Sequence, residues 1–401
     1  MFRSLTIIIL ILCFKQSVFA QKAFEGSFED CKNEAQKYDK LILIDMYFTG
    51  CMPCEEMDRK VFPASKIQEI LNSKYIFYKT NIMKEEDGKK LARKYGASGF
   101  PTYVILNKNG HAIISESGFF GVDRFAELLH SAIMLNDKEE YLAFDLDLNK
   151  IYHRAYSERF IKTGNNYPFS EIRSFLAEQK NQFEETVFLA NSATFFPEYD
   201  AWTYQNLDTL RRMYGPNLLR NKIGRIADSK SKFFGQENKA EEFITMLNYI
   251  KPVYNKKLWT VFLPKYVETY YKENQHLETY YELIKKLNVY SSWETLSNAY
   301  GNIITNPAVE TALLEKILVE YENLIGAGQQ IHETDRFKIA TLYYKLGKFD
   351  KANEWLEKFK QSESKLITDA TLKEFAEAIT AKNNKSYLPK NLIRLLPMLM
   401  E

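Results

Sequence analysis

Cys51 and Cys54 are the residues whose type and spacing most directly suggest chemistry. They follow an apolar run at 41–48 that predicts a buried strand, and they precede a polar stretch that predicts the start of a helix. Two cysteines at such a junction are placed for redox chemistry. Because a helical turn takes about 3.6 residues, we expect Cys51 to be exposed at the helix N-terminus and Cys54 to lie one turn inside.

The elements around this pair predict a compact α/β domain that ends near residue 136, with helices on both faces of a mixed sheet. Asp45 interrupts the apolar strand, and a charge there is unfavourable unless it is paired or protonated. The near-continuous apolar character of that strand is typical of a position at the centre of the sheet. The predicted strands are 41–48, 75–82, 102–106 and 112–115, and the predicted helices are 24–38, Cys51 to about 71 with a bend near Pro63, 86–95 and 122–134.

Residues 139–401 show helical periodicity and almost no strand-like alternation, which predicts an all-helical domain built of helical hairpins. Segment 334–361 resembles one tetratricopeptide repeat, because small residues at Ala340 and Ala352 allow two helices to approach and Gly347 marks the turn between them. An irregular helical domain is the alternative. The clearest helical segments are 175–188, 241–250, 258–271, 277–287 and 311–324, with breaks at 164–166, 215–217, 306–307 and 326–328.

Three features are separated in the sequence: the CxxC pair, Asp45 six residues before Cys51, and Gly99-Phe100-Pro101-Thr102 at the start of a predicted strand. Together they resemble the thioredoxin superfamily over about residues 24–134. The resemblance implies a thioredoxin-like domain over 21–136 that acts as a thiol–disulfide oxidoreductase without a cofactor or a metal ion.

The resemblance also implies roles for individual residues. Cys51 would be the nucleophile, because the unpaired amides and the dipole at a helix N-terminus favour the thiolate that attacks a disulfide. Cys54 would resolve the mixed disulfide, and Asp45 would exchange a proton with Cys54. Lys79 matches a lysine that often accompanies this aspartate. Pro101 would be cis and would form a substrate-binding edge together with Phe100 and Thr102.

Each assignment has an alternative. Cys51 and Cys54 could form a structural disulfide or half of a zinc site. Asp45 could face water at a strand edge, Lys79 could be a solvated strand residue, and Pro101 could be an ordinary trans turn residue.

The motif also departs from the usual family pattern. Thr49-Gly50 replaces the aromatic residue that usually precedes the first cysteine, which predicts a more open nucleophile. Glu55 and Glu56 favour the helix start but disfavour a neighbouring thiolate, so the direction of electron transfer stays open. A third cysteine, Cys31, lies on the apolar face of the first predicted helix, and we interpret it as a buried small hydrophobe rather than a redox thiol.

Residues 1–20 resemble an export signal, with a positive Arg3, an apolar core at 5–14 and small residues before a cut after Ala20. This predicts an exported protein that begins at Gln21, periplasmic if the source is bacterial. No later segment approaches the length that spans a membrane, so we expect no stable membrane insertion. The formal net charge is +2 and falls to zero without the two cationic residues of the signal, which indicates neither nucleic acid nor an anionic membrane as a partner.

Two functions fit these observations. The leading hypothesis is an exported oxidoreductase that reduces or isomerises disulfides of client proteins and is served by an unidentified redox partner. The alternative is a protein-binding scaffold in which residues 139–401 carry the function and the CxxC pair is a redox sensor or a structural disulfide.

Overall fold

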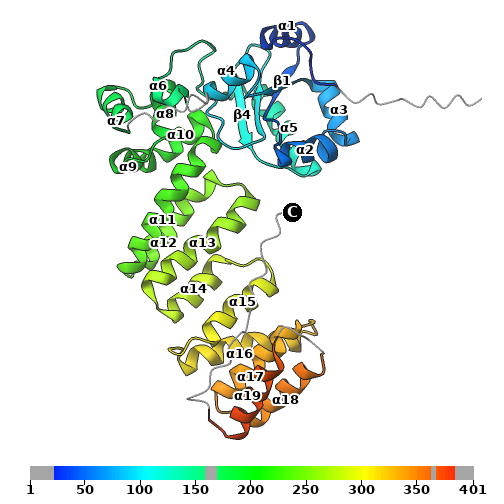
Figure 1. Ribbon diagram of the computed structural model, residues 1–401, viewed down its shortest axis with the longest axis vertical. Helices are drawn as coiled ribbons and strands as arrows, with labels where there is room; N and C mark the ends of the chain where they lie inside the picture. The colour runs from blue at the N-terminus through cyan, green and yellow to red at the C-terminus, as the bar shows by residue number, and fades with distance from the viewer. Residues whose placement is uncertain (1–21, 159–168, 363–366, 384–401) are drawn as a thin grey trace, which may run out of the picture. The chain divides into compact units, whose positions relative to one another are not determined.

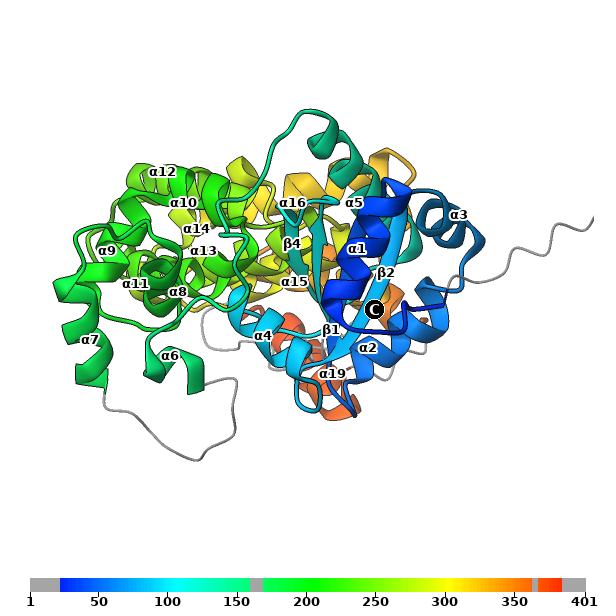
Figure 2. The same ribbon diagram turned by 90° about the horizontal axis from the view of Figure 1, so that it is seen from above.

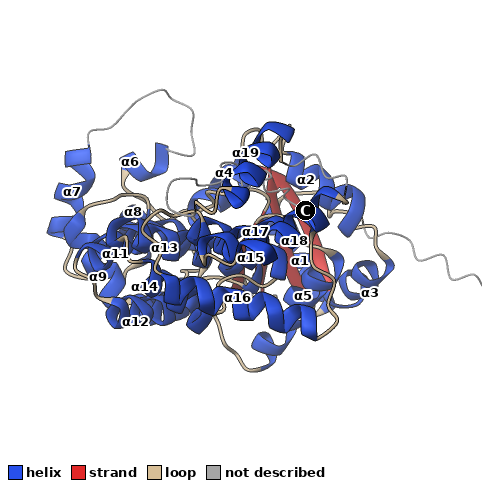
Figure 3. Ribbon diagram, turned by 90° about the horizontal axis from the view of Figure 1, so that it is seen from below, coloured by secondary structure: helices blue, strands red, loops and turns tan. Residues whose placement is uncertain are grey.

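The computed structural model describes residues 22–158, 169–362 and 367–383. The predicted export signal and the predicted break at 164–166 lie outside the described residues. The chain forms two compact units, one up to Ile226 and one from Ala227 onward. The strands of the described chain all lie in the first unit, as the red arrows of Figure 3 show.

The first unit contains a four-stranded mixed sheet in the order β2-β1-β3-β4. β1 (Leu41–Tyr47) lies between β2 (Tyr75–Asn81), which runs parallel to it, and β3 (Thr102–Leu106), which runs antiparallel. β4 (Ala112–Ser117) completes the sheet as the antiparallel neighbour of β3. Every residue of β1 except Tyr47 is buried, which confirms the central position that its apolar sequence predicts.

Helices cover both faces of the sheet, which confirms the predicted α/β architecture (Figure 1). α1 (Phe28–Tyr38) and α4 (Glu86–Lys94) contact β1 and β2, and Figure 2 shows α1 lying over β2. α3 (Ser65–Lys74) packs against β2 and against α5 (Val122–Asp137), which contacts β4.

α1 begins at Phe28 instead of the predicted residue 24, because Ser27 caps it. The Ser27 hydroxyl accepts a hydrogen bond from the Asp30 amide, and the Asp30 carboxylate accepts one from the Ser27 amide.

The helix after the CxxC pair is interrupted rather than simply bent. α2 (Met52–Glu56) continues into a π-helical turn (Met57–Val61), and Pro63 separates that turn from α3. The Gln68 side chain donates a hydrogen bond of 2.6 Å to the carbonyl of Phe62. This bond satisfies a carbonyl oxygen that the interrupted helix does not pair.

Six further helical elements follow in the first unit: α6 (Arg154–Ser157), α7 (Phe169–Glu178), α8 (Glu185–Ser192), α9 (Pro197–Gln205), α10 (Leu207–Tyr214) and the 3₁₀ turn η3 (Asn217–Leu219). α11 (Arg220–Gln236) begins in this unit. The continuous helix predicted over 175–188 is wrong, because the chain leaves α7 at Glu178 and re-enters a helix only at Glu185. Asn181 accepts a hydrogen bond from the Phe183 amide in this gap, a local turn that competes with the helix.

The regular elements among the described residues of the second unit are all helices. Its elements after α11 are α12 (Ala240–Ile250), η4 (Lys251–Val253), α13 (Lys256–Asn274), α14 (Leu277–Leu287), α15 (Trp293–Ile304), α16 (Thr311–Gly326), α17 (Glu333–Lys345), α18 (Phe349–Lys360) and α19 (Asp369–Thr380). α17 and α18 pack together across a turn in which Gly347 has φ of 72°, with Ala340 and Ala352 fully buried. Their relation to a tetratricopeptide repeat stays a prediction, as do the domain boundaries at 136 and 139. Within the described residues, every helix is too short or too polar to cross a bilayer.

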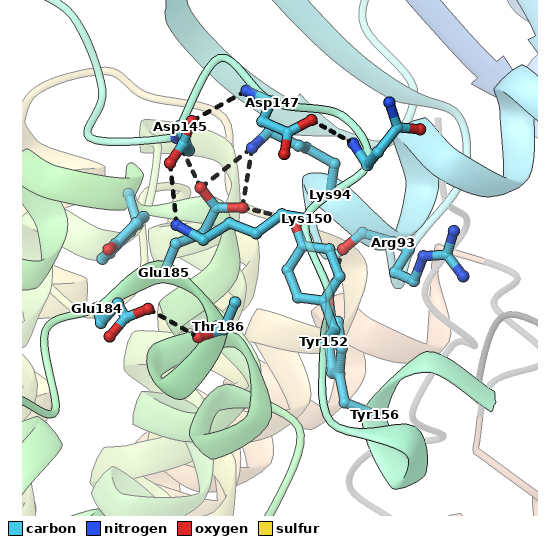
Figure 4. Close-up of polar contacts among 12 residues, drawn as sticks. Arg93, Lys94, Asp145, Asp147, Lys150, Tyr152, Tyr156, Glu184, Glu185 and Thr186 are labelled. Atoms are coloured by element: carbon cyan, nitrogen blue, oxygen red, sulfur yellow. Dashed lines mark hydrogen bonds and ion pairs between the residues drawn. The ribbon is translucent and has the colours of Figure 1, made fainter. Parts of the chain in front are cut away.

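A buried carboxylate fastens the first helices of the helical region to the α/β domain. Glu185 at the start of α8 accepts hydrogen bonds of 3.0 and 3.1 Å from Lys94 of α4, and both side chains are almost inaccessible to solvent (Figure 4). The same carboxylate accepts from the Tyr152 hydroxyl at 2.5 Å and from the Asp145 amide at 2.6 Å. A buried ion pair with this many hydrogen bonds fixes the relative position of its two elements, because neither charge can leave without an unpaired partner.

Candidate active site

Cys51 is the N-cap residue of α2, and it is joined to Cys54 by a disulfide. The Cys51 amide donates to the Phe48 carbonyl at 3.2 Å, and the Cys51 carbonyl accepts from the Glu55 amide at 3.1 Å. Pro53 stands in the first turn of the helix, where its missing N–H leaves no intrahelical bond unmade. The local sequence therefore places the sulfur of Cys51 at a helix N-terminus.

Both cysteines are 3% exposed, whereas Met52 between them is 75% exposed. The expectation that Cys51 is exposed is therefore wrong for the oxidised pair, because the disulfide holds its sulfur against that of Cys54. Gly50 has φ of 87°, a left-handed conformation that favours glycine over the aromatic residue usual at this position.

Asp45 lies in the middle of the sheet with 1% of its surface exposed. The alternative that places it at a water-facing strand edge is therefore wrong. The strand register puts Asp45 beside Lys79 of β2 and Tyr103 of β3. Lys79 Nζ lies 3.7 Å from Asp45 Oδ2, while Asp45 Oδ1 accepts no hydrogen bond from any described residue.

Burial raises the pKa of Asp45 from 3.8 to about 7, because the charged form loses its hydration. The positive charge of Lys79 opposes this effect, and the negative charge of Asp58 adds to it. A carboxyl with this pKa exchanges protons readily near neutral pH.

Asp58 is a site residue that the sequence analysis missed. Lys79 forms an ion pair with Asp58 of the π-helical turn as well as with Asp45, so one cation is shared by two carboxylates. Asp58 follows Cys54 by four residues. That spacing places two residues on one helix face and was the available signal.

The edge predicted to bind substrate adjoins the CxxC loop. The Phe100–Pro101 peptide bond is cis, and Thr102 opens β3 opposite Met46 of β1. The ring of Phe100 meets that of Phe48 edge to face, with ring centres 5.4 Å apart. The Phe48 carbonyl accepts a hydrogen bond from the Cys51 amide, so the contact between the two rings links the cis-proline turn to the cysteine loop.

The surroundings of Cys31 and Glu56 show how each of these residues relates to the redox site. Cys31 is fully buried on α1, and its burial raises the pKa of its thiol to about 12, so it is poorly suited to exchange. Glu56 pairs with Lys60 at 2.9 Å and with Arg59 at 3.5 Å, which offsets part of its unfavourable effect on a nearby thiolate. Within the described chain, no group of three or more His, Cys, Asp or Glu side chains is arranged to hold a metal ion.

The comparisons with known proteins agree with this geometry. Residues 28–133 match the family model described as a thioredoxin-like domain. Thioredoxin-1 of Drosophila melanogaster is 35% identical over 71 residues, which cover 18% of this chain and 61% of that protein. Thioredoxin-1 of Caenorhabditis elegans is 33% identical over 97 residues, which cover 24% of this chain and 76% of that protein.

The matched domain with its CxxC disulfide defines a thiol–disulfide oxidoreductase of the thioredoxin-like class. The chain belongs to the thioredoxin family. Its match spans less than two thirds of the fly protein, at 61%. Among solved structures, the DsbH oxidoreductase aligns at 14% identity with a TM-score of 0.27, covering 31% of this chain and 93% of that one.

Proposed function

We propose that this protein is an exported thiol–disulfide oxidoreductase that reduces or isomerises disulfides of other exported proteins. The observation that carries the proposal is the Cys51–Cys54 disulfide at the N-terminus of α2, on the loop that directly follows the strand bearing buried Asp45. A structural disulfide would need neither a buried carboxyl of raised pKa on the preceding strand nor the adjoining cis-proline turn.

The reaction begins from the reduced pair. The thiolate of Cys51 attacks one sulfur of a client disulfide, forms a mixed disulfide and releases the other client sulfur as a thiolate. Cys54 then loses its proton and attacks the Cys51 sulfur. This step forms the Cys51–Cys54 disulfide and releases the second client sulfur. Two electrons pass from the pair to the client, and the two released thiolates take up two protons.

Asp45 would serve the second step as a proton acceptor. With a pKa of about 7, a substantial fraction of the carboxyl is ionised at neutral pH and can accept the proton of Cys54. The shared cation Lys79 stabilises the ionised form without neutralising it completely, because Asp58 competes for the same ammonium group.

The cycle requires a partner that returns two electrons to the Cys51–Cys54 disulfide. That partner would be a dithiol protein or thiol reductant in the same compartment. The predicted export signal at 1–20 supports a compartment outside the cytosol, periplasmic if the source is bacterial. We expect the helical region to select or position the client.

A direct test is turnover of a disulfide-bonded protein with a small dithiol as reductant. We expect reduction above the uncatalysed rate by the wild type and by Cys31→Ser, and a loss of at least about 100-fold in Cys51→Ser because the attacking group is gone. Wild-type turnover that Cys51→Ser leaves unchanged would overturn the proposal. If the full-length Cys51→Ser variant also replaced the wild type in cells, the scaffold hypothesis would be favoured.

A further inference from the structure

A cavity of about 300 Å³ adjoins the predicted substrate edge. One wall comes from the α/β domain, from Ile82-Met83 after β2 and from the turn before the cis proline. The other wall comes from the ends of α8 and α11. The lining residues that matter here are Met83, Ala97, Phe100, Ala193, Phe195 and Asn221. All of them belong to the first compact unit.

The two walls are held at a fixed separation. Besides the Glu185–Lys94 pair described above, the Tyr156 hydroxyl donates a hydrogen bond of 2.6 Å to the Arg93 carbonyl beside the cavity. Ser117 of β4 donates to the Asn217 side chain at 2.7 Å. These contacts favour a preformed cavity, as is usual for binding sites, rather than one that must open on binding.

The cavity is suited to an uncharged side chain. The rings of Phe100 and Phe195 line it, and the Arg225 guanidinium lies 3.2 Å from the centre of the Phe195 ring. The nearby buried cation Lys222 pairs with Asp200 at 2.7 Å and donates to Asn191 at 2.9 Å. Because that charge is already satisfied within the protein, it offers no attraction to an acidic ligand group.

Phe100 connects the cavity to the reacting cysteines. Its ring lines the cavity and also meets Phe48 of the cysteine loop, and its backbone N–H and C=O form no hydrogen bond with any described residue. An extended peptide can pair with free backbone groups of this kind and place alternate side chains into pockets beside them.

We propose that this cavity binds an apolar side chain, preferably aromatic, of an extended client segment, within two residues of the cysteine that Cys51 attacks. This inference rests on the proposed oxidoreductase function and adds a sequence preference to it. The preference would be absent from an isolated thioredoxin-like domain, because Ala193, Phe195 and Asn221 come from the helices that follow it.

The test uses the reduced full-length protein and a set of peptide disulfides. One peptide has only alanine around its cysteine, and four others carry a single phenylalanine one or two residues before or after it. We expect at least one phenylalanine peptide to react about 10- to 100-fold faster than the alanine peptide, as burial of one large apolar side chain predicts. Hydroxyethyl disulfide, which carries no large apolar side chain for the cavity, reports the intrinsic reactivity of Cys51.

Two variants fill the cavity and one serves as a matched control. Ala193→Phe and Asn221→Phe should remove the preference for phenylalanine and leave the rate with hydroxyethyl disulfide unchanged. Gln205→Phe adds the same ring at an exposed position of α9 outside the cavity and should keep the preference. Asn221 is exposed, so its replacement keeps the test informative if Ala193→Phe fails to fold.

The outcomes separate this proposal from the one on which it depends. Equal wild-type rates for all five peptides, with normal reduction of hydroxyethyl disulfide, would overturn the cavity proposal alone. A preference that persists in folded Asn221→Phe would do the same. Failure to reduce hydroxyethyl disulfide through Cys51 would instead overturn the oxidoreductase function.

Discussion

Replacing Asp45 with asparagine should make the stability of the α/β domain less dependent on pH. Asp45 is buried, and its pKa rises from 3.8 to about 7 on folding. The folded state therefore binds the proton more tightly than the unfolded state. The protonated carboxyl contributes stability that is fully present below about pH 4. That contribution is lost as the pH rises toward 7, where the folded protein must also ionise the buried group.

The magnitude follows from the two pKa values. With about 3.9 for an unfolded aspartate and 1.36 kcal/mol for each pKa unit, ionisation destabilises the fold by about 1.5 kcal/mol at pH 5 and by about 4 kcal/mol at pH 8. The wild type should thus lose about 2.5 kcal/mol between these pH values through Asp45. Asp45→Asn has nearly the same shape and cannot ionise, so this loss should disappear.

Urea titrations of the oxidised wild type and of Asp45→Asn at pH 5 and pH 8 measure this difference. Hydrogen exchange of peptides from β1 and β3 is the suitable readout, because all four Trp residues lie beyond residue 139. All other titrating groups are common to the two proteins and cancel in the comparison. The reasoning would be refuted if the wild type and Asp45→Asn differed in free energy of unfolding by the same amount at pH 5 and at pH 8.

Two further predictions concern buried charges in the first unit. Asp58→Asn should lower the pKa of Asp45, because it removes a negative charge and leaves Lys79 to pair with Asp45 alone; the pH-dependent loss of stability should then be smaller and should end at a lower pH in the same titrations. Lys94→Met should destabilise the first unit by about 3–5 kcal/mol, because it leaves the Glu185 carboxylate buried without its cation; urea unfolding followed by hydrogen exchange in α4 and α8 checks this.

An exposed ion pair provides the control for the second of these predictions. Lys66 pairs with Asp123 at 2.6 Å, and both side chains are more than half exposed. Lys66→Met should therefore change stability by less than about 1 kcal/mol. If Lys94→Met destabilised the protein no more than this control, the conclusion that the Glu185–Lys94 pair fixes α8 against α4 would be contradicted. For Asp58→Asn, a loss of stability that is larger than in the wild type, or that ends at a higher pH, would contradict the shared-cation account.

Local sequence signals were sufficient for the α/β domain. The segments 41–48 and 102–106 are both largely apolar, as strands buried on both faces require, and both strands appear within one residue of their predicted bounds. The positions of Cys51 and Asp45 follow from these elements, because the strand leads directly into the cysteine loop.

Features that depend on contacts between residues far apart in the sequence could not be predicted from local sequence patterns. Lys94 and Glu185 are 91 residues apart, and each alone resembles a solvated helix residue. The cavity is likewise assembled from segments near residues 82, 100, 193 and 221. The break between α7 and α8 was missed because apolar residues continue at helical spacing across a local turn at Asn181.

The central claim is that Cys51 and Cys54 exchange electrons with a client disulfide, and trapping the mixed disulfide tests it most directly. Reduced Cys54→Ser cannot resolve the intermediate, so incubation with a peptide disulfide should yield a covalent adduct. Tandem mass spectrometry should locate it at Cys51, and a dithiol should remove it. No adduct, or an adduct only at Cys31, would contradict the account.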